Sequence, residues 1–197
     1  LIGMEALSAI NLTAPAIALI TAISGMLATG GSAVVMKKMG EHKEQEARQD
    51  FTLLILTNAV VGGVMMVLGY TLMDTLLGTM GLSPAVFGYC HTYLSNYLLF
   101  TIPILLMYNF SLYLIAADKS TLSLICTVTG GVTNIILDYV LIALFDLGIQ
   151  GAAIATGLGY SITAVVGFLV FRKKDSLLRF EKPVFRGGVL FHASTNG

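Results

Sequence analysis

Long uncharged stretches dominate this sequence and constrain its fold more than any other feature. Residues 6–36 and 51–73 contain no Asp, Glu, Lys or Arg, and the later stretches 86–116, 120–145 and 149–171 are also strongly apolar. A membrane-spanning helix needs about 20 mostly apolar residues, and each stretch reaches that length. Only 11% of the residues are charged, against roughly a quarter in soluble domains. We therefore predict an all-α, polytopic membrane helix bundle with five transmembrane spans.

The basic residues fall in alternate connections between these spans. All 11 Lys and Arg lie within 37–48, at 119 or within 172–186, whereas the other connections carry only Glu5, Asp74 and Asp146. Because basic loops stay in the cytoplasm, we predict an external amino end and a cytoplasmic carboxyl end. An odd number of spans that starts outside predicts one missing helix before residue 1. Residues 172–186 are then a basic cytoplasmic linker that ends a lobe at 1–186, and 187–197 begin a truncated following helix.

Several function classes are disfavoured by composition. The net charge is zero, which does not favour a nucleic-acid partner. Cys90 and Cys126 lie in apolar runs without CxxC spacing, so we interpret both as small buried hydrophobes. His91 is the only histidine predicted within a complete span, and it has no HExxH partner. We therefore expect no enzyme, no cofactor and no signal peptide.

One carboxylate, Asp138, interrupts the fourth span. A charged group at the centre of a membrane helix costs about 2.5–3.5 kcal/mol on insertion scales, so such residues usually mark ion or proton pathways. Asn134 lies one helical turn before Asp138, and Thr156 lies at a similar depth after the turn predicted at residues 146–151. Carboxylate, amide and hydroxyl oxygens suit a proton or a hard cation such as Na⁺. We predict a cation-coupling site at these three residues.

The third span is the most polar. Pro103 predicts a kink near its middle, and Asn96, Asn109 and Ser111 are candidates to line a cavity or to bond across helices. Its tyrosines, including Tyr93 and Tyr113, are interpreted as interfacial. Two connections are predicted around this part of the chain: a solvated loop or short surface helix at 37–50 and a loop at 74–84.

Four segments resemble the multidrug and toxic compound extrusion (MATE) transporters. They are GMEALSAINLTAP (3–15), GMLATGGSAVVMKKMGEHKEQEAR (25–48), NIILDYVLI (134–142) and LGIQGAAIATGLGY (147–160). The resemblance covers essentially the whole chain. It implies that the chain corresponds to helices two to six of a six-helix amino-terminal lobe, without the first helix and the carboxyl-terminal lobe.

The resemblance also implies a function. MATE transporters export amphipathic, often cationic compounds from the cell across the plasma membrane, in exchange for H⁺ or Na⁺. Their coupling site joins an acid on the first helix to an Asn and an Asp on the fifth and a Thr on the sixth, which match Asn134, Asp138 and Thr156. Two alternatives remain open: a lipid-linked oligosaccharide flippase of the same superfamily, and a truncated lobe that does not transport.

Overall fold

The computed structural model of the protein describes residues 3–173, 176–185, 188–190 and 193. Every regular element in this part of the chain is a helix, which confirms the predicted all-α class. Residues 188–190 and 193 are also helical, while the rest of the predicted helix start at 187–197 lies outside the described residues. The main elements are α1 (Met4–Gly40), α2 (Glu44–Thr79), α3 (Pro84–Leu98), α4 (Thr101–Ala116), α5 (Ser120–Asp138), the π-helical segment η1 (Tyr139–Leu144) and α6 (Gly148–Phe171).

The helix lengths fit a membrane. Helices α1, α2 and α6, and the helix that α5 and η1 form together, are each long and apolar enough to cross a bilayer. Helices α3 and α4 pass the same test only as a pair, which is bent by 53°. If the pair crosses once, the described residues contain the five predicted spans.

The bend between α3 and α4 follows from Pro103. A proline has no N–H to donate and its ring clashes with the carbonyl four residues earlier, here that of Leu99. The helix breaks at Leu99 and Phe100, and the Thr101 hydroxyl donates to the Leu98 carbonyl at 2.8 Å, which satisfies one group freed by the break. The predicted kink is therefore present, slightly before the proline itself.

Two connections are shorter than predicted. The charged segment 37–50 is mostly helical, because α1 continues to Gly40 and α2 begins at Glu44. The predicted loop at 74–84 is a turn of a few residues, since α2 continues to Thr79 and α3 starts at Pro84. Helices α1 and α2 therefore both extend past their uncharged stretches.

Ion pairs close the turn between α1 and α2. The Lys38 ammonium lies 2.5 Å from the fully buried Asp50 carboxylate and 3.1 Å from that of Glu46. Lys43 donates to Glu41 at 2.7 Å, and this bond lowers the pKa of the Glu41 carboxyl. We call this end of the bundle, which also carries Lys119 and Arg172, the basic end.

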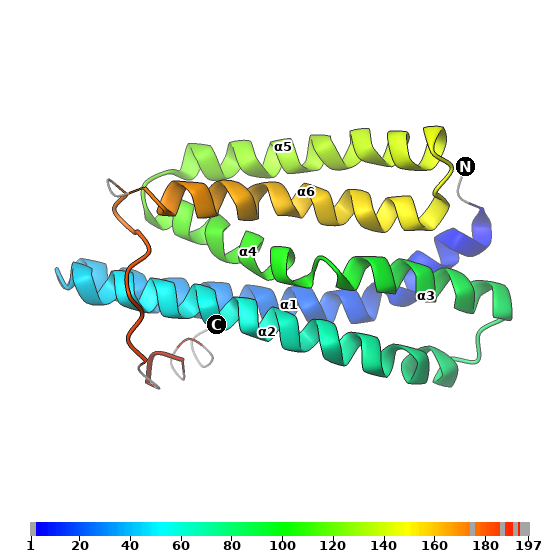
Figure 1. Cartoon of the computed structure of the whole chain (residues 1–197), viewed down its shortest axis with the longest axis horizontal. Coiled ribbons are helices and arrows are strands. Elements are labelled where there is room, and N and C mark those ends of the chain that lie inside the picture. The colour runs from blue at the N-terminus through cyan, green and yellow to red at the C-terminus, as the bar shows by residue number, and fades with distance from the viewer. Residues whose placement is uncertain (1–2, 174–175, 186–187, 191–192, 194–197) are drawn as a thin grey trace.

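The helices form one elongated bundle in which α5 and α6 run side by side (Figure 1). Glycines allow this pair to approach closely. A Cβ atom built on Gly130 of α5 would lie 2.8 Å from the Gly159 carbonyl oxygen of α6. A Cβ atom built on Gly159 would likewise lie 2.8 Å from the Gly130 carbonyl oxygen. No side chain larger than hydrogen fits there without moving a backbone.

An aromatic cluster fills the basic end. Phe51, Phe110, Phe171 and Phe180 pack with ring centroids 5.0–6.5 Å apart. Phe180 belongs to the segment after α6, which therefore lies against the bundle. Tyr113 contributes to the same cluster and is fully buried. Tyr93 is almost fully buried in the core of the other half of the bundle. The prediction of an interfacial position was wrong for these two tyrosines, because their rings fill gaps between helices.

Candidate functional site

Asp138 is the last residue of α5, directly before the π-helical segment η1. The wider turn is visible in the bond from the Phe145 N–H to the Val140 carbonyl, five residues earlier. Such segments insert an extra residue, rotate the side chains that follow, and often occur at functional sites. Leu141 of η1 packs against Gly151 of α6, where a Cβ would meet its side chain at 3.0 Å. The glycine leaves room for the wider turn.

The Asp138 carboxyl group is half-buried and incompletely satisfied. Its Oδ1 atom is buried and has no hydrogen-bond partner among the described residues. Buried polar atoms normally have a partner, so an exception in an apolar span requires an explanation. A bound proton or cation would supply the missing interaction.

Asn134 and Thr156 come together one turn away from Asp138. The Asn134 side-chain amide donates to the Thr156 hydroxyl at 3.4 Å, and that hydroxyl donates to the Ala152 carbonyl at 2.9 Å. The described structure contains no hydrogen bond from Asp138 to either residue. The three predicted site residues thus occupy adjacent turns of one helix pair, with two of them in direct contact.

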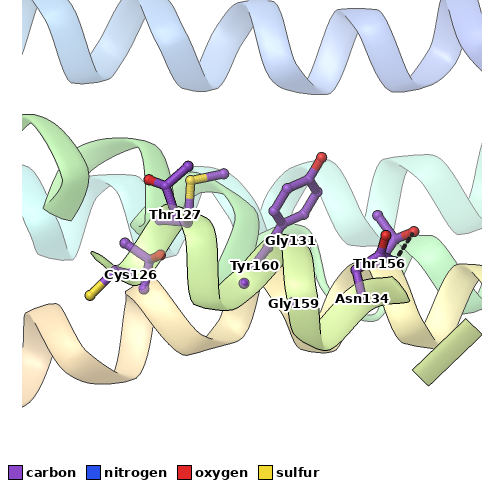
Figure 2. Close-up of a pocket in the computed structure, with 10 residues that line it drawn as sticks. Cys126, Thr127, Gly131, Asn134, Thr156, Gly159 and Tyr160 are labelled. Atoms are coloured by element: carbon purple, nitrogen blue, oxygen red, sulfur yellow. Dashed lines mark hydrogen bonds between the residues drawn. The ribbon is translucent and has the colours of Figure 1, made fainter. Parts of the chain in front are cut away.

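A cavity of about 300 Å³ begins at this pair. In Figure 2, Asn134 and Thr156 lie at one end of the group that lines the cavity, Cys126 lies at the other, and Tyr160 lies between them. The lining is mixed, with hydroxyl groups beside small and apolar residues. Its remaining members are Met107, Thr127, Gly130, Gly131, Gly159 and Thr163.

Sequence reasoning missed most of this lining. Thr127 lies seven residues before Asn134, and Tyr160 and Thr163 lie four and seven residues after Thr156. These are the spacings of one helical face, so extending the face from the predicted pair would have found all three. The free Cys126 is buried, as predicted, but it also borders the cavity.

The other predicted polar residues bond between helices. The Asn109 side-chain oxygen Oδ1 accepts a hydrogen bond from the Asn58 side-chain amide at 3.3 Å, joining α4 to α2. The Ser111 and Ser123 hydroxyls lie 2.9 Å apart and join α4 to α5. Asn96 accepts from Gln150 at 3.4 Å, joining α3 to α6. None of Asn96, Asn109 and Ser111 lines the cavity described above.

His91 also has a neighbour. Its Nε2 atom lies 3.4 Å from a carboxylate oxygen of Asp74, on the opposite end of the bundle from the basic end. Among the described residues, no group of three or more His, Cys, Asp or Glu side chains could hold a metal ion.

These features define a multi-pass helical membrane protein with a polar site between two of its spans. Residues 1–140 match the family model MatE, which covers more than half of the chain. The chain belongs to the MatE family, which confirms the resemblance found in the sequence. The match includes Asn134 and Asp138 and ends before Thr156.

Relatives and solved structures agree with this assignment. The chain is 25% identical over 174 residues to the multidrug export protein MepA of Staphylococcus haemolyticus, covering 88% of this chain and 38% of that relative. An outward-facing multidrug resistance MATE family transporter of the MOP superfamily shares the fold, with a TM-score of 0.90 and 21% identity over 98% of this chain and 43% of that one. An inward-facing structure gives the same TM-score over 96% of this chain. The chain thus spans less than half the length of these proteins.

Proposed function

We propose that this chain forms part of a secondary multidrug exporter, which exchanges amphipathic or cationic compounds for H⁺ or Na⁺. Support comes from family membership and from relatives that are named multidrug export proteins. The observation that carries the coupling step is a buried oxygen of Asp138 that has no hydrogen-bond partner in the described part of the chain, one turn from the Asn134–Thr156 pair. The cavity lining contains no Lys or Arg, so nothing in it favours the flippase alternative.

In this proposal the driving cation neutralises Asp138. Desolvation disfavours the charged carboxylate, and either a proton or a bound cation would remove that cost. Asn134 and Thr156 supply the neutral oxygens that a hard cation needs. One charge that moves inward across the membrane supplies about 2.3 kcal/mol per 100 mV, roughly a 50-fold bias on a two-state equilibrium. The gradient can therefore favour the conformation that releases the exported compound.

The proposed function is tested by efflux from whole cells. Cells that lack their own multidrug pumps and express the full-length protein should expel preloaded ethidium while a H⁺ or Na⁺ gradient exists. Collapse of that gradient by an ionophore should stop efflux even though ATP is still supplied. Efflux that continues without either gradient would contradict antiport, and the absence of efflux would contradict the proposed export of ethidium-like cations.

We further propose that the basic end of the bundle faces the cytoplasm. Single cysteines at Ser83 and at His42 should then differ in their reaction with a membrane-impermeant maleimide on intact cells. Ser83, in the turn between α2 and α3, is expected to label on intact cells, whereas His42, between α1 and α2, is expected to label only after lysis. Cys90 and Cys126 are buried and provide an unlabelled background. The reverse pattern would invert the orientation.

A further inference from the structure

The break between α3 and α4 is enclosed by glycines of two neighbouring helices. Leu98 lies against Gly69 of α2, where an added Cβ would meet its side chain at 2.6 Å. Ile102 lies against Gly62 of the same helix, where an added Cβ would lie 3.1 Å from the Ile102 Cα atom. Both sides of the break therefore rest on bare backbone of α2. Such contacts let α3 and α4 pack closely while they differ in direction.

The third contact of this kind lies on α6. The Phe100 ring occupies the space beside Gly157, and a Cβ built there would lie 2.1 Å from the ring. Phe100 is one of the two residues of the break itself, between the end of α3 and the start of α4. The ring therefore contacts α6 from the point at which the two half-helices change direction.

Gly157 directly follows Thr156, which accepts the hydrogen bond from Asn134. Helix α3, which ends just before the break, contacts α6 at a second point, where Asn96 accepts a hydrogen bond from Gln150 in the first turn of α6. These two contacts lie on either side of Thr156 along α6. The 3.4 Å separation of Asn134 and Thr156 is long for a hydrogen bond, so a shift of a few tenths of an ångström would form or break it.

We propose that Phe100 is a positioning residue for the cation site, and that its contact with Gly157 couples the bend between α3 and α4 to the separation of Thr156 from Asn134. The inference rests on the proposed function, because it assumes that these residues hold the driving cation. A cation that draws the two side chains together would then favour one bend angle. By linkage, the factor by which cation binding shifts the equilibrium between two bend angles equals the factor by which the cation affinities at those two angles differ.

The chain contains a matched control for this contact. Phe110 of α4 packs on Gly167 of α6 in the same way, with a Cβ distance of 2.4 Å, nearer the basic end and away from the break. Shortening either ring by Phe→Leu removes a similar volume from a contact with α6. Only Phe100→Leu alters a contact beside Thr156.

The first measurement is the cation dependence of ethidium efflux by the full-length protein. Phe100→Leu is expected to shift the external Na⁺ or H⁺ concentration that gives half-maximal efflux by about five- to tenfold. Phe110→Leu is expected to leave this concentration unchanged. Phe110→Leu should lower thermal stability at least as much as Phe100→Leu, because Phe110 is fully buried and also packs on Phe171 and Phe180. An equal shift in both variants, or none in either, would overturn the proposal. If Phe100→Leu does not fold, Phe100→Met retains most of the volume and should give a smaller shift in the same direction.

A distance measurement separates this inference from the proposed function. Spin labels at Gly88 of α3 and Val165 of α6, in a Cys90→Ala, Cys126→Ala background, report on the bend. The distance distribution should change on addition of NaCl or acid, and the change should disappear with Asp138→Asn and with Phe100→Leu. A change that Phe100→Leu leaves intact refutes the positioning role alone. A change that survives Asp138→Asn refutes the proposed cation site, and no change in the unmodified chain refutes the coupling to the bend.

Discussion

Replacing Asp138 by Asn is expected to abolish gradient-driven ethidium efflux by the full-length protein. Asparagine has almost the same shape as aspartate but cannot bind or release a proton, and it offers a cation no negative charge. The half-buried side chain would remain in place while the only acidic group of this span is lost. The efflux rate should fall to that of cells without the protein. The efflux rate is measured as the loss of ethidium fluorescence from preloaded cells after an energy source is added.

The matched control is Asp74→Asn. Asp74 also lies on a helix, α2, but its side chain is 73% exposed and its interaction is a 3.4 Å contact with His91. Exposed pairs of this kind contribute little to stability, so efflux should be unchanged. Equal loss of efflux in both variants would indicate a general sensitivity to charge. Unchanged efflux in Asp138→Asn would remove this residue from the mechanism.

Replacing Gly130 by Ala is expected to destabilise the bundle and to lower efflux by about tenfold, which corresponds to ~1.4 kcal/mol. The new methyl group would lie 2.8 Å from the Gly159 carbonyl oxygen, so α5 and α6 must separate. Overpacking of this kind costs about 1–3 kcal/mol, which over most of that range exceeds the ~1 kcal/mol that alanine gains over glycine in a helix. Separation would also lengthen the contact between Asn134 and Thr156.

The neighbouring Gly131 provides the control. An added Cβ at this position meets no atom within 4 Å, so Gly131→Ala gains helix propensity without overlap. Its unfolding temperature should equal or exceed that of the unmodified protein, while that of Gly130→Ala should be lower. The buried Cys90 and Cys126 allow unfolding to be followed with a thiol-reactive dye. Equal unfolding temperatures of the two variants would show that the close contact between α5 and α6 at Gly130 does not limit the stability of the bundle.

Sequence reasoning succeeded where the membrane imposes a simple rule. Uncharged stretches of sufficient length predicted the spans, since a bilayer allows few alternatives to a helix. Pro103 predicted the bend because proline removes a specific backbone bond. Helical spacing and equal depth also indicated that Asn134 and Thr156 lie close together, and the described structure contains their hydrogen bond.

Other features depend on tertiary packing and could not be read from local patterns. The π-helical turn after Asp138 is accommodated by Gly151 on another helix. The burial of Tyr93 and Tyr113 depends on which neighbours leave space for their rings. The seating of Phe100 on Gly157 joins residues that are far apart in sequence. Single-residue preferences carry no information on such pairs.

The central claim is that Asp138, with Asn134 and Thr156, takes up the driving cation. Its most direct test is cation entry during ethidium efflux from proteoliposomes that contain the full-length protein, measured with a trapped pH dye for H⁺ and with ²²Na⁺ for sodium. The account predicts that one of the two cations enters in proportion to the exported dye, and that Asp138→Asn eliminates this entry. Cation entry of equal size in the variant and the unmodified protein would contradict the account.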